Sequence, residues 1–464
     1  MTTRMLAALL VFLAAAPAPA QSRASDRRRS LAAGMPTSDD PRRVPVAPGP
    51  QGPGGAIVLR GGRIFDGTGS PAREGTLVIE RNRIAKVLAA GATDWPASAR
   101  VVDVAGRTVM PGLIDLHTHL DYAYPESPET TDAAAALRGA EKLRYYIESG
   151  ITSVRDVGSG SDVPFQLKQW VRQRLLVGPR VFAAGRLIVG TGGHGTEGSP
   201  RSGPAYGALH NPEMREAKGP DDWREAVREQ FAAGADVIKI ASHFSKAEAA
   251  AAIEEAHALG LKVTCDCENF YVQWAVEAGV DIVEHPLPRT DETIALMAQK
   301  GVAADPTLVP YIYIFDLSGG YFGSTSRRFT FSKEANLEML RRLKKAGLKI
   351  GVGTDLVEAW YRFLPAPYLT ELRQFVAAGF TATEALVAAT KTNSEILDMD
   401  DKLGTLVAGK LADVLVVEGR PDQDLADLLK VQLVIRDGEV VVEDGRVFIP
   451  RHVPVPEPTP KPAG

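Results

Sequence analysis

Residues 109–120 read VMPGLIDLHTHL, an apolar run that ends in two histidines, His117 and His119, with one residue between them. In a β-strand, alternate side chains share a face, so His117, His119 and Asp115 would project from one side of this segment. Two imidazoles this close can both offer a ring nitrogen to one metal ion. The same spacing also arises by chance in loops, so the motif alone leaves metal binding open.

Downstream of this segment, helical stretches alternate with short apolar strands. Each helical stretch stops at a glycine, the residue best suited to a left-handed helix C-cap, and an apolar strand follows within a few residues. The glycines that end these stretches are Gly150, Gly234, Gly260, Gly279, Gly301 and Gly347. With the segments at 109–120 and 180–189, the count reaches eight strands separated by helices. This pattern predicts an α/β fold, a (β/α)8 TIM barrel over residues 112–402.

Short β segments flank the predicted barrel on both sides. Residues 56–111 contain such segments bounded by Gly, Asn or Pro, and residues 403–450 return to β structure with Asp-Gly turns. We expect both ends of the mature chain to form one small β-sandwich domain. The remaining stretch, 451–464, is rich in proline and predicts an extended, solvated tail.

The N-terminus has the pattern of a secretory signal peptide. Residues 1–20 carry one basic residue, Arg4, then an apolar run and an A-x-A site that ends just before Gln21. A buried N-terminal helix is the alternative. We expect cleavage near Gln21 and export, either to a periplasm or out of the cell. Residues 21–55 are rich in Arg, Pro, Gly and Ser without apolar periodicity, which predicts a disordered linker.

Composition narrows the class of partner. The 464 residues carry a net charge of −4, which argues against nucleic acid or a membrane as a partner after signal cleavage and favours a small-molecule substrate. The composition leaves open whether the chain forms a homo-oligomer. The two cysteines, Cys265 and Cys267, are separated by one residue, where a disulfide would be strained. We therefore expect two free thiols and a fold stabilised by its core.

Polar residues recur at the ends of the predicted strands, where the active sites of such barrels lie. Lys239 interrupts the apolar run VIKIA with no acid beside it. Burying its ammonium group is unfavourable unless the group contacts an anion, loses its proton or reacts with CO2 to form a carbamate. Alternatively, the methylene chain of Lys239 packs in the core while its ammonium group reaches solvent. His285 ends DIVEH in phase with Asp281, which would turn Glu284 toward the helices. Asp355 closes the strand KIGVGTD.

The motifs MPGLIDLHTH, VIKI, EH, GTD and KLGTLVAGKLADVLVV together resemble the amidohydrolase superfamily of metal-dependent hydrolases, over about residues 61–449. The similarity is closest to the branch that contains imidazolonepropionase-like enzymes and Xaa-Pro dipeptidases. This resemblance implies that His117, His119 and Asp355 hold one divalent metal. It also implies that a carbamate on Lys239 bridges to a second metal, which His285 binds as well. We expect the metal to be Zn²⁺, as one or two ions.

One segment departs from that branch, whose members commonly place His-Ala-His at the end of the fifth strand. This chain has Asp266-Cys267-Glu268 there, and strand alternation puts Asp266 and Glu268 on the inner face. Because a carboxylate can replace an imidazole as a ligand, Asp266 is a candidate metal ligand and Glu268 a candidate substrate contact. The competing hypothesis is a one-metal enzyme in which Asp266 neutralises an unmodified Lys239.

Further residues are candidates for contact with a substrate. The Gly-rich stretch at 190–212 has no GK[ST] motif and so predicts no phosphate cradle. It resembles the TGGHG loop of the same branch, which makes His194 a catalytic and substrate-facing candidate, with a solvated histidine as the alternative. His243 and Arg155 are further substrate candidates, whereas His257 is predicted to be an ordinary helix residue. Side chains that could bind a substrate carboxylate also include Tyr206, Tyr311, Tyr313, Arg327 and Arg328.

Two functions are compatible with these residues. In the first, the chain is a metal-dependent amidohydrolase that cleaves a C–N bond of a small substrate with activated water, while Asp355 passes the proton to the leaving nitrogen. A Xaa-Pro-type dipeptidase or carboxypeptidase is a narrower form of this hypothesis. In the second, the chain is a non-catalytic binding protein on the same barrel, which the altered fifth strand supports. The retained strand-end residues favour the hydrolase.

Overall fold

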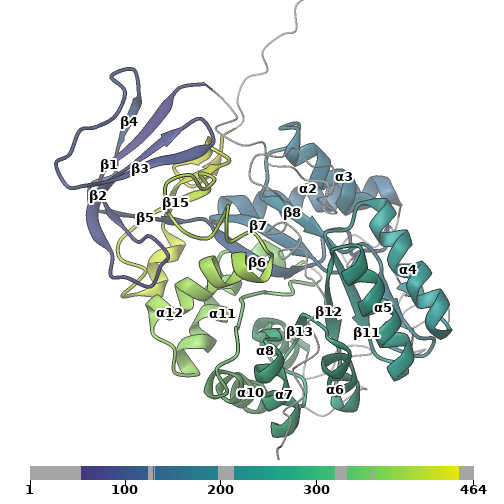
Figure 1. The fold of residues 1–464 in the computed structure, drawn as a ribbon. Helices are drawn as coiled ribbons and strands as arrows, with labels where there is room; N and C mark the ends of the chain where they lie inside the picture. The colour runs from purple at the N-terminus through teal and green to yellow at the C-terminus, as the bar shows by residue number, and fades with distance from the viewer. Residues whose placement is uncertain are drawn as a thin grey trace, which may run out of the picture.

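The computed structural model describes residues 54–123, 129, 131–196, 214–318, 332–357 and 359–448. The expected signal peptide, nearly all of the expected linker, the C-terminal tail, Tyr206, Arg327 and Arg328 lie outside the described residues. None of the described helices combines the length and apolar character needed to cross a membrane. Figure 1 shows a β-rich part built from both ends of the described chain, in purple and yellow, beside an α/β part.

The β-rich part is one mixed sheet of nine strands. Its N-terminal strands are β1 (Ala56–Ile64), β2 (Arg73–Glu80), β3 (Arg83–Ala89), β4 (Arg100–Asp103) and β5 (Arg107–Pro111). Its C-terminal strands are β15 (Val414–Glu418), β16 (Val431–Arg436), β17 (Glu439–Glu443) and β18 (Arg446–Val447). The order is β18-β17-β16-β15-β5-β1-β2-β3, with β4 beside β1. The described strands form one continuous hydrogen-bonded sheet, because β5 and β15 pair directly and antiparallel, and the sandwich arrangement of this sheet stays a prediction.

This sheet fixes the start of the histidine-bearing strand. One face buries an apolar cluster to which both ends of the chain contribute, for example through Leu59 and Val414. On the other face, Leu415 of β15 joins the core of the α/β part. Gly112, directly after β5, donates its backbone N–H to the carbonyl of Asp413 (3.0 Å), so the chain enters the next strand from an anchored position.

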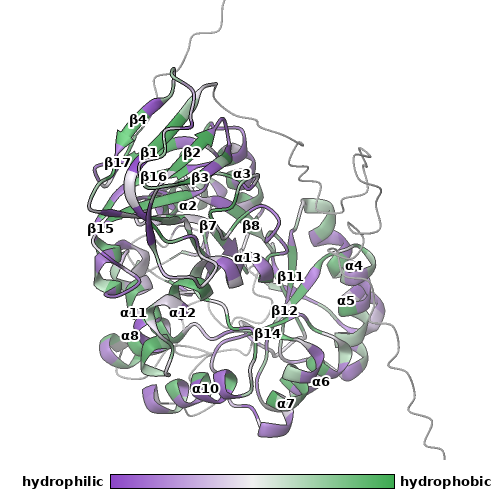
Figure 2. Ribbon diagram, turned by 60° about the vertical axis from the view of Figure 1, so that its left-hand side comes forward, coloured by the Kyte–Doolittle hydropathy of each residue, from purple (hydrophilic) through white to green (hydrophobic). Residues whose placement is uncertain are grey.

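The α/β part contains two parallel sheets with helices around them (Figures 1 and 2). The three-stranded sheet consists of β6 (Leu113–Thr118), β7 (Ile151–Asp156) and β8 (Arg180–Ala183). The six-stranded sheet has the order β10-β9-β11-β12-β13-β14. Its strands are β9 (Leu187–Val189), β10 (Met214–Glu216), β11 (Val237–Ala241), β12 (Lys262–Asp266), β13 (Ile282–Glu284) and β14 (Ala303–Asp305).

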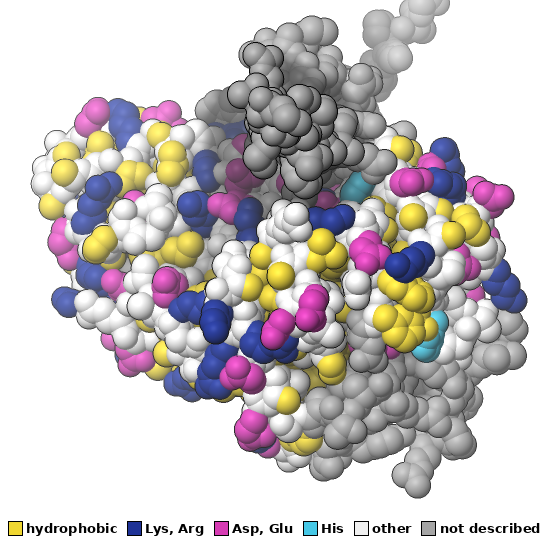
Figure 3. Space-filling view, turned by 60° about the horizontal axis from the view of Figure 1, so that its bottom comes forward, with side chains coloured by type: hydrophobic (Ala, Val, Ile, Leu, Met, Phe, Trp, Pro, Cys, Tyr) yellow, Lys and Arg dark blue, Asp and Glu magenta, His cyan; other side chains and the backbone are white. Residues whose placement is uncertain are grey.

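Helices alternate with these strands along the chain, as the sequence predicts for an α/β fold. They are α2 (Asp132–Glu148), α3 (Val163–Arg172), α4 (Gly219–Ala233), α5 (Lys246–Ala258), α6 (Asn269–Ala278), α7 (Asp291–Lys300), α8 (Leu308–Ser318), α10 (Lys333–Lys345), α11 (Ala366–Ala377), α12 (Ala382–Val387) and α13 (Asn393–Ile396). Figure 3 shows acidic and basic side chains interspersed over the described surface in that view, which is typical of a solvated face.

Backbone hydrogen bonds link the two parallel sheets at both edges. On one side, Gly351 donates its N–H to the carbonyl of Ala304 in β14 (2.8 Å), and Asp355 of the same segment donates to His117 in β6 (2.8 Å). On the other side, Asp236, directly before β11, donates to the last residue of β8 (2.8 Å). The strand ends that carry the candidate residues are thereby brought to one place.

The predicted helix ends and turns are confirmed. All six glycines named above have positive φ, between 68° and 108°. Gly234 and Gly279 are left-handed C-caps of α4 and α6. The turns that join β16 to β17 and β17 to β18 begin with Asp437 and Asp444, each with φ of 51°. These positions agree with the conformations that Gly and Asp adopt at helix ends and in hairpins.

The two cysteines lie on the buried outer side of β12, as strand alternation predicts, and both belong to the main apolar core. The expectation of two free thiols is wrong, because the structure joins Cys265 and Cys267 in a disulfide. Their Cα atoms are 5.4 Å apart, a separation that a disulfide can bridge. Two residues on one face of an extended segment are thus close enough to pair.

Candidate metal centre

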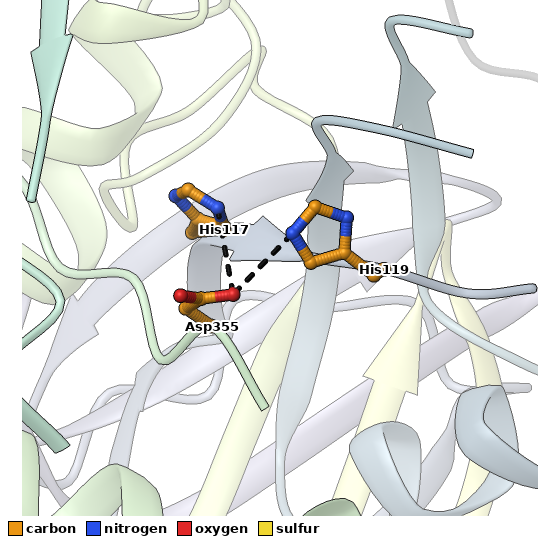
Figure 4. Close-up of side chains that lie close together, drawn as sticks. All are labelled: His117, His119 and Asp355. Atoms are coloured by element: carbon orange, nitrogen blue, oxygen red, sulfur yellow. Dashed lines mark ion pairs between the residues drawn. The ribbon is translucent and has the colours of Figure 1, made fainter. Parts of the chain in front are cut away.

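Three predicted ligands converge where β6 ends (Figure 4). Nε2 of His117 lies 3.6 Å and Nε2 of His119 lies 3.3 Å from the same carboxylate oxygen, Oδ1 of Asp355. One ligand atom from each of the three residues lies within 4.8 Å of the others. His117 and His119 share a face because they alternate along one strand, and Asp355 reaches them because its backbone pairs with that strand.

Hydrogen bonds fix which nitrogens are free. Nδ1 of His119 lies 2.8 Å from the carbonyl oxygen of Gly158, which can only accept, so Nδ1 carries the hydrogen and Nε2 is a bare acceptor. Nδ1 of His117 lies 2.9 Å from a carboxylate oxygen of Glu284, with the same consequence. Oδ1 of Asp355 is buried and receives no hydrogen bond from the described residues. Three acceptors that face one another repel unless a cation lies between them, so these residues fit a metal ion.

Electrostatics favour the protonation states that a metal requires. Burial lowers the pKa of His117 to about 3, and the positive charge of Lys239 acts in the same direction. Burial also lowers the pKa of His119. Burial alone would raise the pKa of Asp355, but the neighbouring imidazoles outweigh it and hold that pKa below its usual range. Neutral imidazoles and an ionised carboxylate are the ligand forms that bind metal at neutral pH.

Lys239 lies in the interior beside the first histidine. It belongs to β11, is 3% exposed, and its Nζ lies 3.4 Å from Nε2 of His117. In the described part of the chain it forms no ion pair with a carboxylate. The expected conflict between a lysine charge and its surroundings is therefore present in the structure.

A second cluster lies beside the first. Oδ2 of Asp266 is 3.4 Å from Nε2 of His285 and 3.5 Å from Nε2 of His194. Nδ1 of His285 is 3.9 Å from Oδ2 of Asp355, which connects the two clusters. The structure thus brings together six predicted site residues. His117, Lys239 and Asp266 lie in strands β6, β11 and β12, whereas His119, His285 and Asp355 follow β6, β13 and the segment that contains Gly351.

The substrate candidates have different surroundings. Glu268 is 3% exposed and accepts a hydrogen bond from the hydroxyl of Ser242 (2.8 Å). His243 is exposed, and its ring lies 5.0 Å from that of Tyr271. Tyr311 is buried with its ring 6.0 Å from that of His285. Tyr313 packs against Trp360 on the segment after the last strand, at a ring distance of 5.4 Å.

Strand alternation mispredicts the end of β13. His285 has φ of 64°, so the chain leaves the extended conformation there and the inner and outer faces exchange. Glu284, expected to face the helices, points inward to His117. Asp281, expected inside, receives a hydrogen bond from Nε2 of His257 on α5 (2.8 Å), so His257 is also more than an ordinary helix residue.

Three buried charged residues lie beneath the metal ligands. Arg155, a substrate candidate from the sequence, is fully buried, and its Nη2 lies 2.6 Å from Oε1 of Glu284 and 3.3 Å from Oδ2 of Asp305. Because Arg155 is fully buried in this network, its side chain does not reach a solvent-exposed surface where a substrate could contact it. Sequence reasoning missed Glu284 and Asp305; the available signal for Asp305 was an acid that closes a short strand, as Asp355 does.

Known proteins resemble this chain over most of its length. Residues 108–441 match the model described as the amidohydrolase family. An ochratoxinase from Aspergillus niger is 27% identical over 405 residues, which cover 79% of this chain and 82% of that protein. An imidazolonepropionase from Symbiobacterium thermophilum is 26% identical over 433 residues, covering 85% and 92%. The solved structure of a prolidase complexed with N-methylphosphonate-L-proline has a TM-score of 0.74 and 29% identity, and it covers 84% and 100% of the two chains.

Proposed function

The chain belongs to the amidohydrolase family and is a hydrolase that acts on C–N bonds, and from this premise we propose that its substrate is a dipeptide or an N-acyl amino acid. The observation that carries the metal-dependent chemistry is the set of three acceptor atoms on His117, His119 and Asp355, which lie within 4.8 Å of one another. Similarity to a prolidase and to a Xaa-Pro dipeptidase, at 29% and 26% identity, favours substrates with a free carboxylate beside the scissile bond.

The fold that holds this site is, in our proposal, a closed (β/α)8 barrel. Its eight strands would be β6, β7, β8, β11, β12, β13, β14 and the segment that contains Gly351. The backbone hydrogen bonds at both edges of the two parallel sheets support closure, since they join the first strand to the last and β8 to β11. The metal ligands then lie at the carboxyl ends of the strands, where such barrels place their chemistry.

His117, His119 and Asp355 would hold the first divalent metal, and imidazole and carboxylate donors suit Zn²⁺. When bound, a divalent metal supplies Lewis acidity, which polarises a carbonyl group and lowers the pKa of water. Asp266 and His285 would contribute to a second site. A carbamate on Lys239 would join the two sites: the ammonium Nζ loses two protons and bonds to the carbon of CO2, which turns a cation into a carboxylate-like anion.

Side chains of this protein would carry out proton transfer and contact the substrate. Asp355 is placed to accept a proton from the attacking water, because its second oxygen is turned toward the cluster of His285 and Asp266. The same carboxyl group can deliver that proton to the leaving nitrogen. His194 lies on the other side of Asp266 with a side chain that is 19% exposed, so it can reach a bound substrate.

Hydrolysis assays after metal removal test this function. Protein stripped with a chelator should lose turnover of dipeptides, N-acyl amino acids or cyclic amides and regain it when Zn²⁺, Mn²⁺ or Co²⁺ is added. The control variant is His257→Ala, which removes an imidazole that contacts Asp281 away from the metal centre and should keep the response to metal. Undiminished hydrolysis in stripped protein would contradict the metal role. Binding without turnover of every compound would favour a non-catalytic protein.

We also propose that residues 1–20 are a signal peptide that directs export of the chain. The support for this proposal is the apolar run and A-x-A site in the sequence. N-terminal sequencing of the protein recovered outside the cytoplasm should begin near Gln21. An intact Met1 in a protein confined to the cytoplasm would refute it.

A further inference from the structure

We propose that Glu284 is a positioning residue that fixes the tautomer of His117, and so leaves Nε2 of His117 free for a metal. This inference rests on the proposed function, because it assigns a supporting role to a residue beneath the same site. Both side chains are fully buried, and Oε2 of Glu284 lies 2.9 Å from Nδ1 of His117. An ionised carboxylate can only accept at that contact, so the hydrogen must be on Nδ1.

The second oxygen of Glu284 is held by its own donors. Nη2 of Arg155 lies 2.6 Å from Oε1, and the hydroxyl of Thr264 also contacts this oxygen. Nε of Arg155 donates to the backbone carbonyl of Leu116, one residue before His117 (2.5 Å). The guanidinium therefore ties the carboxylate of β13 to the strand that carries the histidine. Donors on both oxygens leave the carboxylate little freedom to rotate.

This cluster is better explained as support for a ligand than as a metal site of its own. Ligand atoms of His117, Glu284 and Asp305 lie within 4.8 Å of one another. However, the guanidinium of Arg155 lies against both carboxylates and already supplies the positive charge. A metal ion there would have to displace a fully buried guanidinium. A carboxylate that orients the far nitrogen of a ligating imidazole is a general way to fix its tautomer and raise its basicity.

A glutamine at this position would reverse the tautomer. Glu284 accepts hydrogen bonds on both oxygens, whereas an amide has one oxygen and one NH2 group. If the amide oxygen keeps Arg155 and Thr264, its NH2 group faces Nδ1 of His117. Nδ1 must then accept, and the hydrogen moves to Nε2, which points toward Oδ1 of Asp355. An imidazole in that form cannot bind a metal through Nε2.

The first measurement is the tautomer itself in metal-free, full-length protein. The chain has eight histidines, so ¹⁵N-histidine labelling gives a spectrum that is simple enough to assign with a His117→Asn variant. Wild-type protein should show His117 with the hydrogen on Nδ1, and Glu284→Gln should show it on Nε2. A wild-type His117 with the hydrogen on Nε2 would overturn the proposal, and this result needs no variant at position 284 to fold.

The second measurement is Zn²⁺ affinity by competition with a chelator. Glu284→Gln should bind Zn²⁺ about 10- to 100-fold more weakly than wild type, the range for loss of such a partner. The matched control is Glu371→Gln. Glu371 is also fully buried and accepts from two donors, the backbone N–H groups of Leu308 (2.9 Å) and Val309 (2.7 Å), so its replacement creates a similar local defect away from the histidines.

These measurements distinguish failure of the positioning role of Glu284 from failure of the proposed function. Equal Zn²⁺ affinity in wild type, Glu284→Gln and Glu371→Gln would refute the positioning role, as would equal weakening in both variants. A wild-type protein that binds no metal at all would refute the proposed function, while the tautomer spectrum would still report on Glu284. If Glu284→Gln fails to fold, the wild-type tautomer decides the matter.

Discussion

Nε2 of His119 and Oδ1 of Asp355 lie 3.3 Å apart, and both atoms are hydrogen-bond acceptors. The contact is therefore repulsive in the absence of a cation. The fold keeps it because other bonds hold each partner: the carbonyl of Gly158 fixes the imidazole, and the backbone of Asp355 is bonded to His117. The metal-free protein thus stores an unfavourable interaction that a bound cation would remove.

Asp355→Asn should stabilise the metal-free protein and abolish its stabilisation by metal. The amide NH2 can donate to Nε2 of His119, a gain of about 1 kcal/mol. Thermal unfolding of stripped protein should show a midpoint raised by about 1 °C. Zn²⁺ at about 100 times its Kd should stabilise wild type by about 2.7 kcal/mol and the variant hardly at all. Asp103→Asn, at an exposed carboxylate of β4, should behave as wild type in both conditions.

Lys239→Ala should lose bound metal and activity, and short carboxylic acids such as formate or acetate should restore part of both. The reason is that a carboxylate in the space of the missing side chain can replace a carbamate beside His117. Lys168→Ala is the control, since it removes a lysine of similar burial that is paired with Asp236 (2.7 Å). Acid rescue of Lys168→Ala, or full activity of Lys239→Ala without any acid, would contradict the carbamate.

Metal stoichiometry should distinguish one site from two. Protein purified without chelators should contain close to two equivalents of divalent metal, and Asp266→Ala close to one, because Asp266 lies between two imidazoles. Glu268→Gln, two residues further along the chain, should keep the wild-type ratio. One equivalent in all three proteins, with an unmodified Lys239 by native mass spectrometry, would leave a mononuclear hydrolase.

Asp281→Asn should cost about 1 to 3 kcal/mol of unfolding free energy at pH 7, because Asp281 accepts from His257 and from the backbone of Val263. Burial opposes its charge, but the hydrogen bond and the charge of His257 outweigh burial and lower its pKa. A lowered pKa contributes stability above the unfolded value of 3.8, and this contribution disappears as pH falls through the folded value.

Denaturant unfolding of wild type and Asp281→Asn at pH 7, 5 and 3 tests this expectation. The difference between the two proteins should be constant between pH 7 and 5 and should shrink at pH 3. A difference that does not change with pH would mean that the hydrogen-bond geometry, and not the charge, carries the effect.

Strand alternation explains both what the sequence could predict and where it failed. In β6 and β12 the backbone stays extended, so the inward placement of His117, His119 and Asp266 follows from spacing alone. At His285 the positive φ interrupts that spacing, and nothing in the local sequence marks the change, since no glycine is present. Glu284 and Arg155 were misplaced for the related reason that their partners come from strands far apart in sequence.

The pairing of β5 with β15 has a consequence for the order in which the chain can fold during synthesis. β5 is complete when the ribosome has made residue 111, but its partner begins only at Val414. Until then, one edge of β5 exposes unpaired backbone groups next to the strand that carries His117 and His119. A nascent or truncated chain that ends before Val414 should therefore be prone to edge-to-edge association, even with every metal ligand already present.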